Sequence, residues 1–153
     1  QGRTVDFRHA VIVMTSNLGS DIIQDIKDEP YNVMKDAVME VVQQAFRPEF
    51  INRIDEVVVF HSLNAEQIRE IAKIQIARIA KRLSEHDYQL EVDDKAVDFI
   101  AEHGFDPVYG ARPLKRALQQ YFENPLAEKI LKGDFEPGDT IHVKCAKGDL
   151  SFH

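Results

Sequence analysis

Residues 46–60 read Phe-Arg-Pro-Glu-Phe-Ile-Asn-Arg-Ile-Asp-Glu-Val-Val-Val-Phe, and the rest of the chain is organised around this stretch. Pro48 ends the helix that precedes it, because its ring clashes with the turn behind it and excludes helical geometry at the residue before it. Arg53 therefore projects from a short, stiff turn, where a guanidinium can meet an anion from outside the fold. The alternative is a weak surface ion pair with Glu49 or Asp55, which the composition alone favours.

Two apolar runs predict buried strands. Residues 10–14, Ala-Val-Ile-Val-Met, and residues 57–60 are both typical of strands buried on two faces of a parallel α/β sheet. Ligands of open α/β sheets bind beyond the carboxyl ends of the strands, so Asn17 can orient a water or a phosphate oxygen there. Alternatively, Ser16 or Asn17 caps a helical turn after Leu18, and the residues alone favour this cap.

The composition changes at residues 61–64, His-Ser-Leu-Asn, and we place a domain boundary there. Upstream, residues 28–30 (Asp-Glu-Pro) start one amphipathic helix. Residues 1–60 thus resemble the last third of a larger α/β sheet, with too few strands to close a core alone. Downstream, Asn64 and Gln67 form a capping box that starts a helix with a buried apolar stripe.

The C-terminal part of the sequence predicts a small α+β domain. A short strand at residues 89–92 and a hairpin with its turn at residues 147–148 make a three-stranded sheet that packs on helices. Asp93 caps a helix that ends at Gly104, where we expect a positive φ. A later helical stretch is interrupted at residues 124–125, Asn-Pro, which predicts two separate helices.

Residues 105–116 read Phe-Asp-Pro-Val-Tyr-Gly-Ala-Arg-Pro-Leu-Lys-Arg and carry a second arginine of interest. Gly110 allows a tight turn and Pro113 fits the first turn of a helix. Arg112 then lies at a helix N-terminus, which attracts anions, and adds a forked donor for phosphate. Residues 112–132 hold five basic and two acidic side chains, an excess suited to one anionic ligand. A structural pair between Arg112 and a carboxylate is an equal alternative.

Composition excludes several other classes of protein. The chain has 153 residues, 44% hydrophobic and 29% charged, with no apolar stretch long enough to cross a bilayer and no secretory signal. Nineteen basic against 26 acidic residues give a net charge of −7, which disfavours a nucleic-acid binder. Cys145 is the single cysteine, so no internal disulfide forms and a reducing cytosol is favoured. The six histidines show no metal-ligand spacing, so we expect no metal site.

Four elements together resemble the C-terminal part of the second ATPase module of ClpB-type AAA+ protein disaggregases, in the Clp ATPase family. They are the strand ending at Asn17, the turn with Arg53, the helix that starts after Asn64 at the domain boundary (the hinge helix), and Gly-Ala-Arg at residues 110–112. The resemblance implies an α/β fold class. Residues 1–61 are expected to be the C-terminal end of an AAA+ large α/β domain, and residues 62–153 the small α+β C-terminal domain.

The resemblance also implies roles for single residues. Asn17 corresponds to sensor 1. Arg53 corresponds to the arginine finger, which reaches into the ATP site of the next subunit and acts there in catalysis. Both residues lie in the segment assigned to the large domain.

The remaining implied contacts are with ATP in the same subunit. Arg112 corresponds to sensor 2, which touches the γ-phosphate, and Gly110 and Ala111 belong to the same motif. Ile71, on the hinge helix, is expected to border the adenine, although core packing is the alternative. Magnesium would come with ATP, held by residues outside this chain.

For the intact protein, the resemblance implies an ATP-dependent ring chaperone of the stress response that threads and solubilises aggregated proteins. A hexameric ring, unfolded or aggregated polypeptide and a DnaK-type chaperone are the implied partners, in the cytoplasm, with no nucleic acid or membrane. One alternative is the C-terminal part of a peptidase-coupled Clp unfoldase. Another is a free-standing, non-enzymatic interaction domain.

The chain by itself should not be an active ATPase. The sequence contains neither a Gly-x-x-x-x-Gly-Lys-Ser/Thr phosphate loop nor an apolar strand ending in the paired acids that hold magnesium. The aromatic loop that grips polypeptide in this family is also missing. We therefore expect neither ATP hydrolysis nor tight ATP binding by these 153 residues. Calorimetry tests this, and binding at millimolar affinity or better would contradict it.

Overall fold

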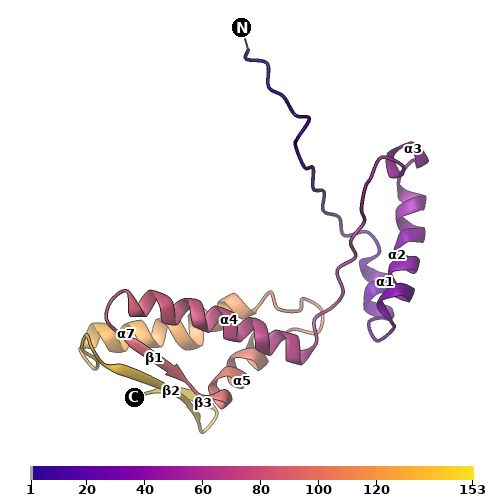
Figure 1. Cartoon of the computed structure of the whole chain (residues 1–153). Helices are drawn as coiled ribbons and strands as arrows, with labels where there is room; N and C mark the ends of the chain where they lie inside the picture. The colour runs from indigo at the N-terminus through magenta and orange to yellow at the C-terminus, as the bar shows by residue number, and fades with distance from the viewer. Residues whose placement is uncertain (1) are drawn as a thin grey trace. The chain divides into compact units, whose positions relative to one another are not determined.

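A computed structural model describes residues 2–153 and divides them at His61, into unit 1 up to His61 and unit 2 from Ser62 to His153 (Figure 1). Unit 1 contains three helices, α1 (Ser20–Asp25), α2 (Tyr31–Ala45) and α3 (Pro48–Ile51). Unit 2 contains α4 (Ala65–Ser84), β1 (Gln89–Val92), α5 (Asp94–His103), α6 (Leu114–Leu118), the π-helix η1 (Gln119–Glu123), α7 (Asn124–Lys132), β2 (Thr140–Ala146) and β3 (Asp149–Phe152). No helix in the described residues combines the length and apolar character that a membrane crossing requires.

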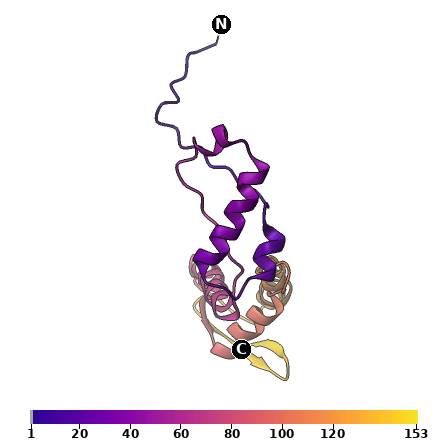
Figure 2. The same cartoon turned by 90° about the vertical axis from the view of Figure 1, so that its right-hand side faces the viewer.

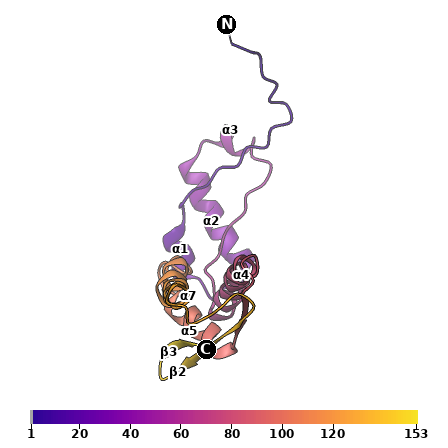
Figure 3. The ribbon, with the colours of Figure 1, turned by 90° about the vertical axis from the view of Figure 1, so that its left-hand side faces the viewer.

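Two prolines set the helices of unit 1. Pro30 is the N-cap of α2, which confirms the predicted helix start, and Pro48 occupies the first position of α3. Helix α1 runs alongside α2 (Figures 2 and 3), where Gly19, with φ of 73°, leads into α1 close to Val38. Met34, Val38 and Val59 form the small apolar cluster of this unit.

The predicted strands at residues 10–14 and 57–60 are not formed. Val11 is 88% exposed, whereas Val59 alone of its run is buried. Figure 1 draws the first run as an extended trace. A buried strand is stable only when neighbouring strands satisfy its backbone groups, and residues 2–61 contain no strand that could do so. Most apolar side chains of the two runs are therefore exposed in the described structure.

The predicted cap of α1 is also wrong. Gly19 is the N-cap, and no side chain caps the helix. Ser16 Oγ instead accepts a hydrogen bond from the amide of Leu18 at 3.1 Å, before the helix begins. A hydroxyl that bonds two residues ahead forms a local turn and cannot reach the first turn of a helix that starts at Ser20.

The predicted three-stranded sheet of unit 2 is confirmed. Its order is β1-β2-β3, with β1 parallel to β2 and β2 antiparallel to β3. Lys147 and Gly148 both have positive φ, 56° and 80°, as a tight hairpin turn requires. Alternate residues of β2, Ile141 and Val143, are fully buried on the side of the strand that packs on α5. The same core contains Phe122, which lies edge-to-face with Phe152 at 5.7 Å.

Side-chain caps start helices α4 and α5 of unit 2. Asn64 Oδ1 accepts from the amide of Gln67 at 2.8 Å, and Gln67 Oε1 accepts from the amide of Asn64 at 3.0 Å. This reciprocal pair is the predicted capping box. Asp93 Oδ1 accepts from the amide of Ala96 at 2.8 Å and caps α5, also as predicted.

The helical stretch from Leu114 to Lys132 is continuous, so the predicted break at residues 124–125 is wrong. Asn124 has helical dihedral angles, makes no side-chain cap, and its amide donates to the carbonyl of Gln119, five residues back. Pro125 has no amide hydrogen, and its ring would clash with the carbonyl four residues earlier in a regular α-helix. The wider π turn η1 accommodates this ring without ending the helix.

Gly104 ends α5, but not with the positive φ that we expected. Its φ is −94°, which any residue adopts. A Cβ at this position would lie 2.5 Å from Leu114 Cδ1 and 2.8 Å from Leu114 Cα. Glycine is therefore required because the end of α5 and the start of α6 touch, and not because the backbone turns left-handed.

Replacing Gly104 tests this contact. Gly104→Ala should lower the free energy of unfolding by about 1–3 kcal/mol, because the added methyl overpacks the contact with Leu114. Chemical denaturation followed by circular dichroism measures this change. Gly2→Ala is the matched control, since nothing lies within 4 Å of a Cβ there, and a loss equal to that of the control would contradict the explanation.

Candidate functional site

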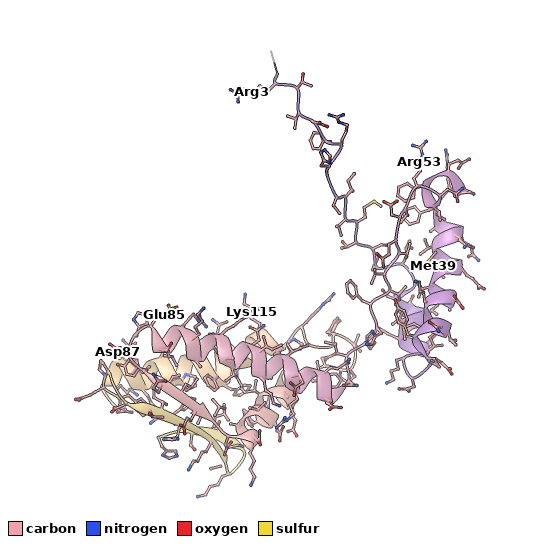
Figure 4. All side chains as sticks on the ribbon, in the orientation of Figure 1. Arg3, Met39, Arg53, Glu85, Asp87 and Lys115 are labelled. Atoms are coloured by element: carbon pink, nitrogen blue, oxygen red, sulfur yellow. The ribbon has the colours of Figure 1, made fainter. Side chains whose placement is uncertain are left out.

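Arg53 lies on the turn that follows α3 (Figure 4). The turn is held by its backbone, because the amide of Arg53 donates to the carbonyl of Phe50 at 3.1 Å. Just before this turn, the rings of Phe46 and Phe50 pack on each other with their centres 5.1 Å apart. The Arg53 side chain is exposed, and within residues 2–153 it forms no ion pair, so the predicted alternative of pairing with Glu49 or Asp55 is not formed.

The loop before α6 is closed by Asp106. Its backbone exchanges two hydrogen bonds with Gly110, at 2.9 and 2.7 Å. Its Oδ1 accepts from the amides of Val108 and Tyr109, both at 2.8 Å. Gly110 adopts φ of 62°, which confirms the predicted tight turn. The Gly-Ala-Arg segment therefore begins in a turn whose backbone is fixed by hydrogen bonds.

Arg112 lies two residues before α6, with Pro113 as the N-cap. Its amide donates to the carbonyl of Tyr109 at 3.3 Å, and its Cζ lies 5.9 Å from the centre of the Tyr109 ring. The side chain is exposed, and in the described part of the chain no carboxylate pairs with it. The alternative of a structural pair between Arg112 and a carboxylate is therefore not formed.

A groove of about 720 Å³ in unit 2 runs between α4 and the segment of α6 and η1, and Ile71 and Ala111 both line it. Its other apolar lining comes from Ile79, Leu114 and Leu118. Its basic side chains are Arg78, Lys81, Arg82 and Lys115, against the acids Glu85 and Glu123. Figure 4 shows Lys115 and Glu85 on the same side of this unit. An apolar floor with a basic rim suits a ligand that has a flat apolar part and an anionic part.

The basic lining of the groove was only partly visible in the sequence. The excess of basic residues over residues 112–132 includes Lys115. Arg78 and Arg82, one helical turn apart on α4, join it only because the fold places α4 and α6 on the same groove. Arg82 Nη2 donates to Glu123 Oε1 at 2.5 Å, so this cation is already paired across the groove.

Asn17 is exposed and lies three residues before Ser20, the first residue of α1. Its carbonyl accepts from the amide of Ser20 at 3.2 Å and from Ser20 Oγ at 2.6 Å. The structure therefore brings Ile71 and Ala111 into one groove, with Gly110 and Arg112 beside Ala111 in the chain. Asn17 and Arg53 both belong to unit 1.

Arg69 shows what a structurally used arginine looks like in this fold. Its Nε donates to Asp98 Oδ1 at 2.6 Å and its Nη2 to Asp94 Oδ1 at 3.0 Å, which ties α4 to α5. The hydrogen bond to Asp98, more than any other contact, raises the pKa of Arg69 above its usual range. Arg53 and Arg112 lack such partners in the described residues.

Comparison with known protein families matches both parts of the chain. The family described as the C-terminal, D2-small domain of ClpB protein matches residues 63–143, and an AAA domain family (Cdc48 subfamily) matches residues 1–57. This chain belongs to the ClpB family. The resemblance in the sequence and the fold class that it implied are thereby confirmed.

The relatives extend over the whole chain. The chaperone protein ClpB of Vibrio cholerae serotype O1 is 60% identical over 151 residues, which cover 98% of this chain and 18% of that protein. The chaperone protein ClpB of Vibrio vulnificus is 59% identical over 154 residues, and ClpB 1 of Thermosynechococcus vestitus is 52% identical over 155. The chain thus spans about a fifth of the length of these ClpB-family relatives.

The unpaired state of the two arginines can be tested through stability. Arg53→Ala and Arg112→Ala should each change the free energy of unfolding of this chain by less than about 1 kcal/mol, because neither side chain supports the fold through an ion pair. Phe122→Ala, which empties the core, should cost about 3–5 kcal/mol and serves as the positive control. Urea titrations measure all three. A loss above about 2 kcal/mol for either arginine would show an internal partner.

Proposed function

We propose that this chain is the nucleotide-sensing and subunit-contacting part of the second ATPase module of a ClpB-type ring disaggregase. Unit 1 is then the C-terminal end of the large ATPase domain, and unit 2 is the small C-terminal domain. The observation that supports this most directly is that Arg53 and Arg112, both carried on fixed turns, have no ion-pair partner in the described residues. Each guanidinium keeps its donors for an external anion.

The proposed ligand of unit 2 is ATP. The groove offers apolar side chains, Ile71 and Ala111, for a base, and the exposed Arg112 follows Ala111 directly with a forked donor for phosphate. This chemistry fits a nucleoside triphosphate. Magnesium would be held by residues outside this chain. Within these assignments Gly110 lets the backbone turn so that Ala111 and Arg112 face the nucleotide.

In the proposed function, unit 1 contributes Arg53 to the ATP site of a neighbouring subunit and Asn17 to hydrolysis in its own subunit. Arg53 completes the ATP site of the next subunit, where it neutralises charge that develops on the transferred phosphoryl group. Asn17 orients a water or a phosphate oxygen in its own subunit. In the intact ring, hydrolysis would change the angle at residues 61–64 and drive the threading of polypeptide.

The proposed setting follows the family. We propose a hexameric ring in the cytoplasm that acts on unfolded or aggregated polypeptide together with a DnaK-type chaperone. The relatives above are named as ClpB chaperones. A peptidase-coupled unfoldase or a free-standing interaction domain is therefore not favoured.

The full-length protein tests the proposal. Arg53→Ala should lower ATP turnover by roughly three to five powers of ten while nucleotide binding is retained, because the finger acts on the transition state. Asn17→Ala should also lower turnover with binding retained, and Arg112→Ala should weaken ATP binding as well. Steady-state ATPase assays and nucleotide titrations measure these effects.

The control is Arg116→Ala, which removes another exposed arginine of the same chain and should leave turnover unchanged. When Arg53→Ala subunits are mixed into wild-type rings, the fractional loss of ATP turnover should exceed the fraction of variant subunits, because each variant subunit disables the ATP site of its neighbour. A fully active ring of Arg53→Ala subunits would end the assignment of the arginine finger.

A further inference from the structure

The loop that carries Arg112 is anchored at both ends. Gly104 and Leu114 are in contact, so the end of α5 and the start of α6 bring residues 105 and 113 close together. Leu114 is itself part of the main core. The loop between them therefore begins and ends on the packed core. The conformation of the loop then depends on the contacts within the loop itself.

Inside the loop, Asp106 fixes the turn from which Arg112 emerges. Its carboxylate accepts from two successive amides, those of Val108 and Tyr109, and its backbone pairs with Gly110. These four hydrogen bonds hold the backbone of Tyr109 in one conformation. Arg112, three residues on, donates its amide to that same residue.

Tyr109 also contacts the charged end of Arg112. The distance of 5.9 Å from the guanidinium carbon to the ring centre is within the range of a cation–π interaction. Tyr109 is 60% exposed, so its ring is not needed for the core. Val108, beside it and 62% exposed, does not share this contact and provides an internal comparison.

An aromatic ring and a carboxylate hold a guanidinium in different ways. The N–H donors of arginine lie in the plane of the guanidinium, so a carboxylate partner occupies them, as Asp94 and Asp98 do with Arg69. A ring offers no carboxylate oxygen to these donors, and a ring stacked on the guanidinium covers one face of the plane and leaves the donors free. It also restricts a long side chain before the ligand arrives, which reduces the entropy lost on binding.

We infer that Asp106 and Tyr109 are positioning residues that hold the Arg112 guanidinium, with its donors free, for the terminal phosphate of a nucleoside triphosphate. This inference rests on the proposed function, in which Arg112 contacts that phosphate. Asp106 sets the backbone of the loop, and Tyr109 sets the direction of the side chain.

The test is the ratio of ATP affinity to ADP affinity in the full-length protein. Tyr109→Leu and Asp106→Ala should each lower this ratio about two- to fivefold, the size of an exposed cation–π contact. Tyr109→Phe keeps a ring, and Asp106→Asn keeps a side-chain oxygen acceptor, so both should stay near the wild-type ratio. Val108→Ala is the matched control. A purely structural role would change both affinities together and leave the ratio unmoved.

A second measurement separates this inference from the proposed function. In an Arg112→Ala background, Tyr109→Leu should have no further effect on the ratio. If Arg112→Ala lowers the ratio but Tyr109→Leu and Asp106→Ala do not, the positioning role is wrong and the proposed function stands. If Arg112→Ala leaves the ratio unchanged, the proposed function of Arg112 fails and the positioning role fails with it.

Discussion

The constraint on which this structure depends is the contact between the end of α5 and the start of α6. Gly104 lets Leu114 approach so closely that a methyl group between them would meet both its side chain and its backbone. Leu114 then enters the core with Ile100, Phe122 and Ile141. Because this contact fixes both ends of the loop of residues 105–113, the packing of the core also decides where Ala111 and Arg112 are presented.

Arg53 in unit 1 and Arg112 in unit 2 are both exposed and without an ion-pair partner in the described residues, but the local structure that holds the arginine differs between the two units. Arg112 leaves a loop that is closed by Asp106 and held by the large core of unit 2. Arg53 follows a four-residue helix whose backbone hydrogen bonds hold a local turn, while the apolar cluster of unit 1 contains three buried residues. A short turn with its own hydrogen bonds can hold a side chain firmly even where little core lies behind it. This is how a small unit can still present a defined guanidinium.

The exposed apolar residues of unit 1 have a physical explanation. Val11, Ile12 and Val13 are more than 80% exposed in the structure, although their sequence is that of a buried strand. Burial of a central strand is a property of a sheet, since each strand depends on its neighbours for hydrogen bonds and for covering side chains. Residues 10–14 have the apolar, β-branched pattern of a buried strand, but the structure of residues 2–61 supplies no neighbouring strand.

Local signals in the sequence determined much of this protein. The capping box at Asn64, the cap at Asp93, the alternation in residues 140–146 and the tight turn at Gly110 each depend on residues a few positions apart, so their chemistry could be worked out from the chain alone. The same holds for the motifs that carry Arg53 and Arg112. Only the tertiary structure decided why position 104 must be glycine, how η1 carries Pro125 without a break, and which residues share the groove with Ile71. The contact at Gly104 and the lining of the groove arise where separate segments of the chain meet, and no spacing along the chain encodes the distance between two packed helices.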